Sequence, residues 1–209
     1  LGSTPLIGFA GAPFTLAAYM VEGRPSRDHL AARELMYADP DAWQGLVAWV
    51  SALAGRFLRA QVVAGASAVQ LFDSWAGALS DRDYQEHCAW GSAQALGAVE
   101  DLPVPRIHFA TAASHLLTSL AQAGATAVGV DYRTPLDEAA AVLPDVPLQG
   151  NINPALLGAP WEVLESHVQD VITRGGIAAG HVVNLGHGMP PHADPEVVAR
   201  VVEYVHTHG

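Results

Sequence analysis

The sequence predicts an α/β protein built around a parallel β-sheet. Short apolar runs alternate with longer amphipathic segments along the 209 residues. The runs are continuous rather than alternating in polarity, which is typical of parallel strands buried on both faces. Glycines and polar residues follow several runs directly. Together these observations indicate repeated β-α units.

Six apolar runs are predicted to be strands. They cover residues 5–10, 68–72, 104–109, 127–130, 146–149 and 181–185. Residues 41–64 place apolar side chains at helical spacing, and the preceding Asp39-Pro40 pair is typical of a helix start. Asp194-Pro195 begins the last predicted helix in the same way.

An internal repeat supports the repeated unit. The segments 64–69 and 123–128 share the pattern Ala-Gly-Ala-Ser/Thr-Ala-Val, and each leads to an aspartate, Asp73 or Asp131. The glycine suits a helix C-terminus, and the apolar run that follows is a strand. Two architectures remain open, a doubly wound sheet and a (β/α)₈ barrel. No Gly-x-Gly-x-x-Gly or Walker sequence favours the nucleotide-binding sheets, and a barrel needs two strands beyond these six.

Composition excludes several classes of function. The net charge is -11, and all ten cationic residues are arginine, which argues against nucleic-acid binding and lysine Schiff-base chemistry. Cys88, expected on a helix, is the single cysteine, so an internal disulfide or a multi-cysteine metal centre is excluded, and a reducing cytoplasm is favoured. The uncharged stretches 1–21 and 107–130 contain glycines, prolines or histidines, and we expect no membrane span there.

Polar groups follow the predicted strands. Asp73, Asp131 and His187 are candidates for charge or proton chemistry, because active sites of barrels lie at the carboxyl ends of strands. Capping of the next turn is the alternative for the two aspartates, and a solvated turn is the alternative for His187. Ser74 is expected to contribute a hydrogen-bonding hydroxyl. His206 and His208 are expected to lie on a frayed helix end, and no metal site is predicted there.

Two blocks of the sequence are distinctive, Gly-Phe-Ala-Gly-Ala-Pro-Phe-Thr-Leu at residues 8–16 and Leu-Phe-Asp-Ser-Trp-Ala-Gly at residues 71–77. Together with residues 19–23, 35–40, 60–66, 148–154 and 184–188, these blocks resemble the uroporphyrinogen decarboxylase family. The resemblance covers nearly the whole chain. It implies a (β/α)₈ TIM barrel, a homodimer, a cytoplasmic location and no cofactor.

The resemblance also implies that residues 1–209 form one barrel domain whose N-terminal part is missing, leaving strands three to eight. An arginine-rich segment and an aspartate belong to that part, so no catalytic residue is expected in this chain, and the chain alone is expected to be inactive. Departures from the family are Asn153 for aspartate, Thr111 for lysine, and Tyr132-Arg133 for a Trp-Thr pair.

The implied activity is that of a carboxy-lyase of porphyrin and haem biosynthesis. It converts uroporphyrinogen III to coproporphyrinogen III by decarboxylating four acetate side chains, with no nucleic acid or membrane as partner. Tyr19, Ser74 and His187 are the implied substrate contacts and are expected to line one cavity. Phe9 and Phe72 are expected against the apolar faces of the macrocycle. The alternatives are a corrinoid-linked methyltransferase and a non-catalytic porphyrin-binding chain.

Overall fold

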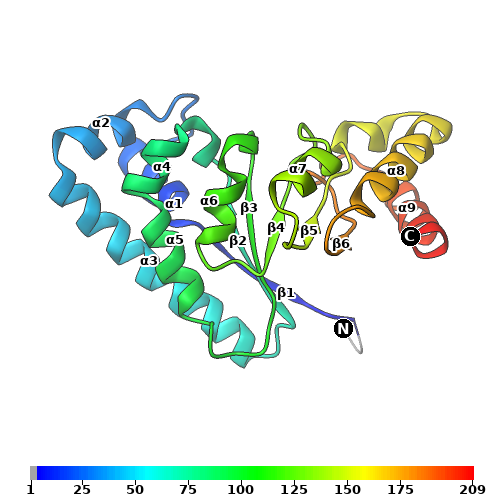
Figure 1. The fold of residues 1–209 in the computed structure, drawn as a ribbon. Helices are drawn as coiled ribbons and strands as arrows, with labels where there is room; N and C mark the ends of the chain where they lie inside the picture. Colours follow the sequence, from blue (N-terminus) through cyan, green and yellow to red (C-terminus); the bar gives the residue numbers. More distant parts are fainter. Residues whose placement is uncertain (1–3) are drawn as a thin grey trace. The chain divides into compact units, whose positions relative to one another are not determined.

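A computed structural model of the chain describes residues 4–209 (Figure 1). The chain divides into two compact units, Leu1–Ala127 and Val128–Gly209, and each is described by itself. The first unit contains β1 (Ile7–Gly11), α1 (Pro13–Glu22), α2 (Leu30–Ala38), α3 (Pro40–Val63), β2 (Ala68–Asp73), η1 (Ala76–Ala78), α4 (Asp81–His87), α5 (Ala89–Gly97), β3 (Arg106–Ala110), η2 (Ser114–Leu116) and α6 (Leu117–Gln122). The strand β4 (Ala127–Gly129) leads into the second unit, with α7 (Leu136–Val142), β5 (Leu148–Gln149), η3 (Pro154–Gly158), α8 (Trp161–Gly175), β6 (His181–Val182) and α9 (Pro195–His208).

All six predicted strands are present, and the pairings within each unit are parallel. In the first unit β1 pairs with β2 and β2 pairs with β3. In the second unit β4 pairs with β5 and β5 pairs with β6. The α/β class predicted from the apolar runs is therefore confirmed.

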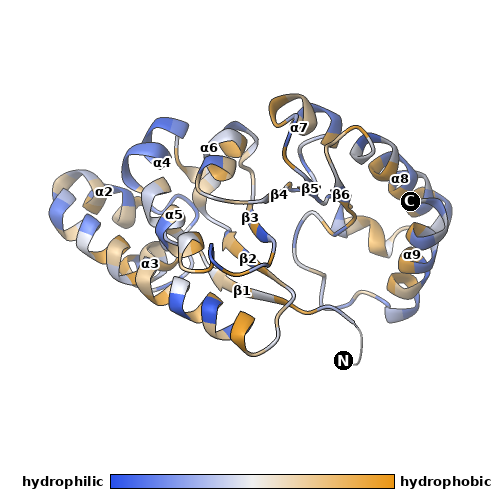
Figure 2. Ribbon diagram, turned by 60° about the horizontal axis from the view of Figure 1, so that its bottom comes forward, coloured by the Kyte–Doolittle hydropathy of each residue, from blue (hydrophilic) through white to orange (hydrophobic). Residues whose placement is uncertain are grey.

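The first unit is organised by α3, which packs on α1, α5 and β1. Asp39 caps this helix, because its side chain accepts a hydrogen bond of 3.1 Å from the amide of Ala42, and Pro40 occupies the first turn. The buried side of α3 includes Trp43, Val47 and Leu58. Hydropathy alternates along the helix (Figure 2), as expected for one face on a core.

By length and composition, α3 is the single helix within residues 4–209 that is apolar enough to cross a membrane. Its apolar side is shared with the core of the first unit, where Val47 and Leu58 are fully buried. Arg56 and Arg59 also lie within the helix, and Arg59 forms a two-pronged ion pair with Asp101. These contacts describe a core helix with one solvated side.

The side of β1 away from β2 is covered at one position by a side chain. The Gln61 amide of α3 accepts from the Phe9 backbone N–H at 2.8 Å and donates to the Phe9 carbonyl at 2.9 Å. A side-chain amide thus replaces the ladder partner that the backbone of Phe9 would find in a neighbouring strand.

In the second unit, α8 packs on α7 and α9. Arg174 of α8 donates to Asp137 of α7 at 2.8 Å, which links α7 to α8. Arg174 also donates to Asp170, one turn earlier in α8, at 2.9 Å. Asp194 caps α9 by accepting from the amide of Glu196, so this helix begins where the sequence predicts.

Candidate functional site

Three phenylalanines line one face of the sheet in the first unit. Phe9 of β1 contacts Phe72 of β2 edge to face, with ring centroids 5.7 Å apart, and Phe72 contacts Phe109 of β3 in the same way at 5.7 Å. Phe109 is buried, Phe72 is half-buried and Phe9 is 58% exposed. The two predicted apolar contacts, Phe9 and Phe72, therefore belong to one aromatic surface, which is exposed to solvent at Phe9.

An aromatic stack lies where β2 ends. Trp75 stacks on Tyr19 of α1, with ring centroids 3.8 Å apart and an interplanar angle of 24°. Trp75 also stacks on His29, with centroids 4.2 Å apart and an angle of 20°. Tyr19 is 47% exposed, whereas His29 is buried just before α2. The predicted contacts Tyr19 and Ser74 are thus close neighbours of the same indole.

Asp73 points away from solvent and is fully buried. Its Oδ1 accepts a hydrogen bond of 2.7 Å from the hydroxyl of Thr15 in α1. Burial raises the pKa of Asp73 to about 6, and the hydrogen bond from Thr15 opposes part of that rise. The buried hydroxyl of Tyr84 in α4 also faces this carboxyl and likewise lowers its pKa. The carboxyl group therefore links β2 to α1 in the interior of the first unit.

Asp131 has the turn role that was the alternative to proton chemistry. Its Oδ1 accepts from the Arg133 amide at 3.0 Å, and its Oδ2 accepts from the Arg133 guanidinium at 2.8 Å. The guanidinium carbon also lies 4.3 Å from the centre of the Tyr132 ring. Tyr132-Arg133, which differs from the Trp-Thr pair of the family, thus forms a turn in which Arg133 neutralises the buried carboxylate of Asp131.

Two asparagines organise the loop after β5. The Asn151 amide donates to the backbone carbonyls of Asp131 and Thr134. The side chain of Asn153 accepts from the Ala155 amide at 3.0 Å and so begins η3. An aspartate would accept the same hydrogen bond, so this departure from the family preserves the cap.

His187 lies in the loop between β6 and α9, and its side chain is exposed. The preceding Gly186 packs against the backbone of Tyr132, where an added Cβ would lie 2.3 Å from the amide nitrogen. The glycine is therefore needed for close approach of this loop to the end of β4. Since His187 belongs to the second unit and Tyr19 and Ser74 belong to the first, the single cavity expected for all three stays a prediction.

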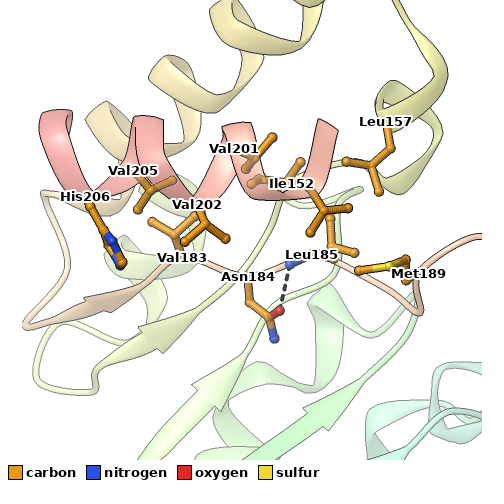
Figure 3. A pocket seen from close by; sticks show the side chains of 11 residues that line it. Ile152, Leu157, Val183, Asn184, Leu185, Met189, Val201, Val202, Val205 and His206 are labelled. Carbon is orange, nitrogen blue, oxygen red and sulfur yellow. Dashed lines mark hydrogen bonds between the residues drawn. The ribbon is translucent and has the colours of Figure 1, made fainter. Parts of the chain in front are cut away.

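A cavity of about 240 Å³ in the second unit lies under α9 (Figure 3). Its lining is mainly aliphatic: Ile152, Leu157, Val183, Asn184, Leu185, Met189, Val198, Val201, Val202, Val205 and His206. None of the predicted substrate contacts belongs to it. His208 at the end of α9 stacks on Tyr204, with ring centroids 4.0 Å apart, and no three metal-ligating side chains cluster within the described residues.

Sequence reasoning missed residues whose role depends on tertiary contact. Trp75 follows Ser74 at the strand end, and that position was the available signal. No local pattern could have predicted the roles of Thr15 and His29, because their partners Asp73 and Trp75 are distant in sequence. The expectation that Cys88 lies on a helix is wrong. Cys88 is fully buried at the junction of α4 and α5, where it is the last cap position of α4 and the first of α5, and its backbone N–H donates to the Tyr84 carbonyl.

Comparison with known proteins gives a consistent result. Residues 1–208 match the family described as uroporphyrinogen decarboxylase (URO-D). Proteins named uroporphyrinogen decarboxylase from Arthrobacter sp. (strain FB24) and Leifsonia xyli are 61% and 58% identical, each over 99% of this chain. The chain spans 60% and 59% of their respective lengths.

A solved methyltransferase from Methanosarcina mazei has a similar fold, with a TM-score of 0.85 over 99% of this chain and 60% of the other. Its sequence identity is 15%, so the likeness concerns the fold alone. Together with the family match, it supports the predicted succession of barrel strands and helices.

Proposed function

The chain belongs to the uroporphyrinogen decarboxylase family, and we propose that the protein containing it decarboxylates the acetate side chains of uroporphyrinogen III to give coproporphyrinogen III. The observation that carries the proposal is the family match over residues 1–208. The relatives from Arthrobacter and Leifsonia agree with it by name. The activity would serve porphyrin and haem biosynthesis.

The substrate is an apolar macrocycle with a carboxylated rim. Residues in or next to β1, β2 and α1 offer apolar groups for the macrocycle and polar groups for the carboxylates. The exposed ring of Phe9 and the half-buried ring of Phe72 present apolar surface for the macrocycle. The hydroxyls of Tyr19 and Ser74 are hydrogen-bond donors for carboxylates. His187, in its exposed loop, would bind a further carboxylate or transfer a proton.

The reaction needs a sink for the electrons released with carbon dioxide. A pyrrole carbon protonated in the substrate would provide that sink without a cofactor, and the enzyme would then stabilise the resulting cation. Asp73 is a poor candidate for that task because its carboxyl is fully buried against Thr15. Asp131 is also a poor candidate because Arg133 already neutralises it. The family resemblance implies that the stabilising carboxylate comes from outside residues 1–209.

Release of carbon dioxide from uroporphyrinogen tests the proposal. The 209-residue chain would be compared with the same chain joined to the part of the Arthrobacter relative that it does not cover. We expect turnover from the joined protein and none from the chain alone. A joined protein that binds uroporphyrin without turnover would instead favour a non-catalytic porphyrin-binding role.

Substitutions test the site assignment in the joined protein. Tyr19→Phe, Ser74→Ala and His187→Gln are each expected to lower kcat/KM by about 10- to 100-fold, because each removes a polar contact to a charged substrate group. Ser166→Ala and His192→Gln are matched controls, since both side chains are exposed in the second unit. Unchanged kcat/KM in all three site variants would remove these residues from the site.

The proposal extends to the whole molecule. One barrel domain, a homodimer and a cytoplasmic location are supported by the family resemblance, with no nucleic acid or membrane as partner. The acidic charge of -11 agrees with the absence of a nucleic-acid partner. Sedimentation of the joined protein at several concentrations would give its oligomeric state, and a monomer throughout would contradict the homodimer.

A further inference from the structure

One peptide group at the end of β2 is held from both sides by threonine hydroxyls. The group joins Ser74 to Trp75. Its N–H donates to the hydroxyl oxygen of Thr15, 3.2 Å away in α1. Its carbonyl oxygen accepts from the hydroxyl of Thr111, which directly follows β3. Three separate segments of the first unit therefore meet at this peptide.

The direction of the hydrogen bonds is fixed by the chemistry of the hydroxyl group. Thr15 has one hydroxyl proton, and it donates that proton to Oδ1 of Asp73 at 2.7 Å. The lone pairs of the same oxygen then remain for the N–H of Trp75. Thr15 is 5% exposed and Asp73 is fully buried, so water does not compete at this point. Asp73 thereby orients Thr15 as an acceptor.

Rotation of this peptide would displace two groups at once. Ser74 carries a hydroxyl beside it, and Trp75 carries the indole on which Tyr19 stacks at 3.8 Å. The turn that follows has no room to adjust, because a Cβ on Gly77 would lie 2.2 Å from the carbonyl oxygen of Thr111. The orientation of the peptide and the packing of the turn are thus determined by the same neighbours.

We propose that Thr15 and Thr111 are positioning residues that clamp the Ser74–Trp75 peptide and so hold the Ser74 hydroxyl and the Tyr19 ring in the orientation that binds substrate carboxylates. The assignment rests on the proposed function for the substrate, but the clamp itself does not. It also gives Thr111, which replaces a lysine common in the family, a specific role in this chain. Asp73 acts through Thr15 and not on the substrate.

The clamp can be observed directly by NMR. Ser74-Trp75 is the single Ser-Trp pair in the sequence, so labelling serine carbonyls with ¹³C and tryptophan amides with ¹⁵N gives one cross-peak from this peptide. Thr15→Val should speed exchange of the amide proton by about tenfold, because the proton loses its acceptor. Thr111→Val should shift the carbonyl carbon upfield. Thr15→Ser and Thr111→Ser should restore the wild-type peak.

Binding and turnover separate positioning from a general loss of stability. In the joined protein used to test the function, each valine variant should raise the KM for uroporphyrinogen and the Kd for uroporphyrin by about tenfold, with a smaller change in kcat. Each serine variant should recover both values. Thr118→Val is the matched control, because Thr118 is exposed on α6 in the same unit.

The outcomes are distinct. A cross-peak unchanged by both valine substitutions would overturn the clamp. A shifted cross-peak with unchanged KM and Kd would overturn its positioning role. Failure of the wild-type joined protein to bind or decarboxylate would overturn the proposed function and the substrate part of this inference, whereas the cross-peak would still decide whether the clamp exists.

Discussion

Replacement of Asp73 by asparagine should make the stability of the protein depend less on pH. The Asp73 carboxyl is fully buried, and burial raises its pKa from 3.8 to about 6. The folded protein therefore holds this proton more tightly than the unfolded chain does. The stabilising contribution is fully present below pH 3.8 and is lost as the pH rises through about 6.

The size of the effect follows from the two pKa values. The interval between 3.8 and about 6 corresponds to about 3 kcal/mol. Of this, about 2 kcal/mol is lost between about pH 4.5 and about pH 7.5. Asparagine is neutral throughout and its Oδ1 can still accept from Thr15. The free energy of unfolding of Asp73→Asn, relative to wild type, should rise by about 2 kcal/mol over that range.

Urea unfolding of both proteins at the two pH values measures this difference. Trp43, Trp49, Trp75 and Trp90 lie in the first unit with Asp73, so tryptophan fluorescence mainly reports that unit. Other titrating groups cancel in the comparison, including His108, whose pKa burial lowers to about 4. Glu100→Gln, at an exposed position in the same unit, should show no such trend. A difference between Asp73→Asn and wild type that is independent of pH would refute the reasoning.

Four further substitutions test the packing of the first unit. Gly77→Ala should destabilise the protein, because a Cβ at this position would lie 2.2 Å from a backbone oxygen. Gly97→Ala should stabilise it by about 0.5–1 kcal/mol, because a Cβ at this helical position meets open space. Equal urea midpoints for the two variants would contradict both expectations. Gln61→Ala should cost about 1–2 kcal/mol and increase self-association in sedimentation, since the backbone of Phe9 loses both partners; an unchanged sedimentation profile would remove the edge-covering role. Leu58→Ala should cost about 3 kcal/mol in urea unfolding, because this side chain is fully buried, and a cost below about 1 kcal/mol would show that the site collapses around the cavity.

The sequence by itself determined the features that depend on neighbouring residues along the chain. The six apolar runs located the strands, because a strand that packs on a core selects apolar residues. Burial on both faces holds for most of β2 and β3, whereas β1 alternates buried and exposed side chains and neither residue of β6 is fully buried. Asp39 and Asp194 located two helix starts, because a cap bonds an amide two or three residues away. The turn role of Asp131 could be predicted for the same reason, because its partner Arg133 is two residues away. The family blocks added the expected site residues.

The tertiary structure alone decided which polar groups became partners. Asp73 and Asp131 occupy equivalent positions in the internal repeat, yet one is paired with Thr15, 58 residues away, and the other with an arginine two residues away. Asp73 is the last residue of β2 and Ser74 begins the turn, so Asp73 is fully buried whereas Ser74 is partly exposed, although they are adjacent in sequence. The clamp on the Ser74–Trp75 peptide likewise depends on α1 and the end of β3 meeting at β2. Such contacts between distant segments are set by how helices and strands pack, which no local pattern encodes.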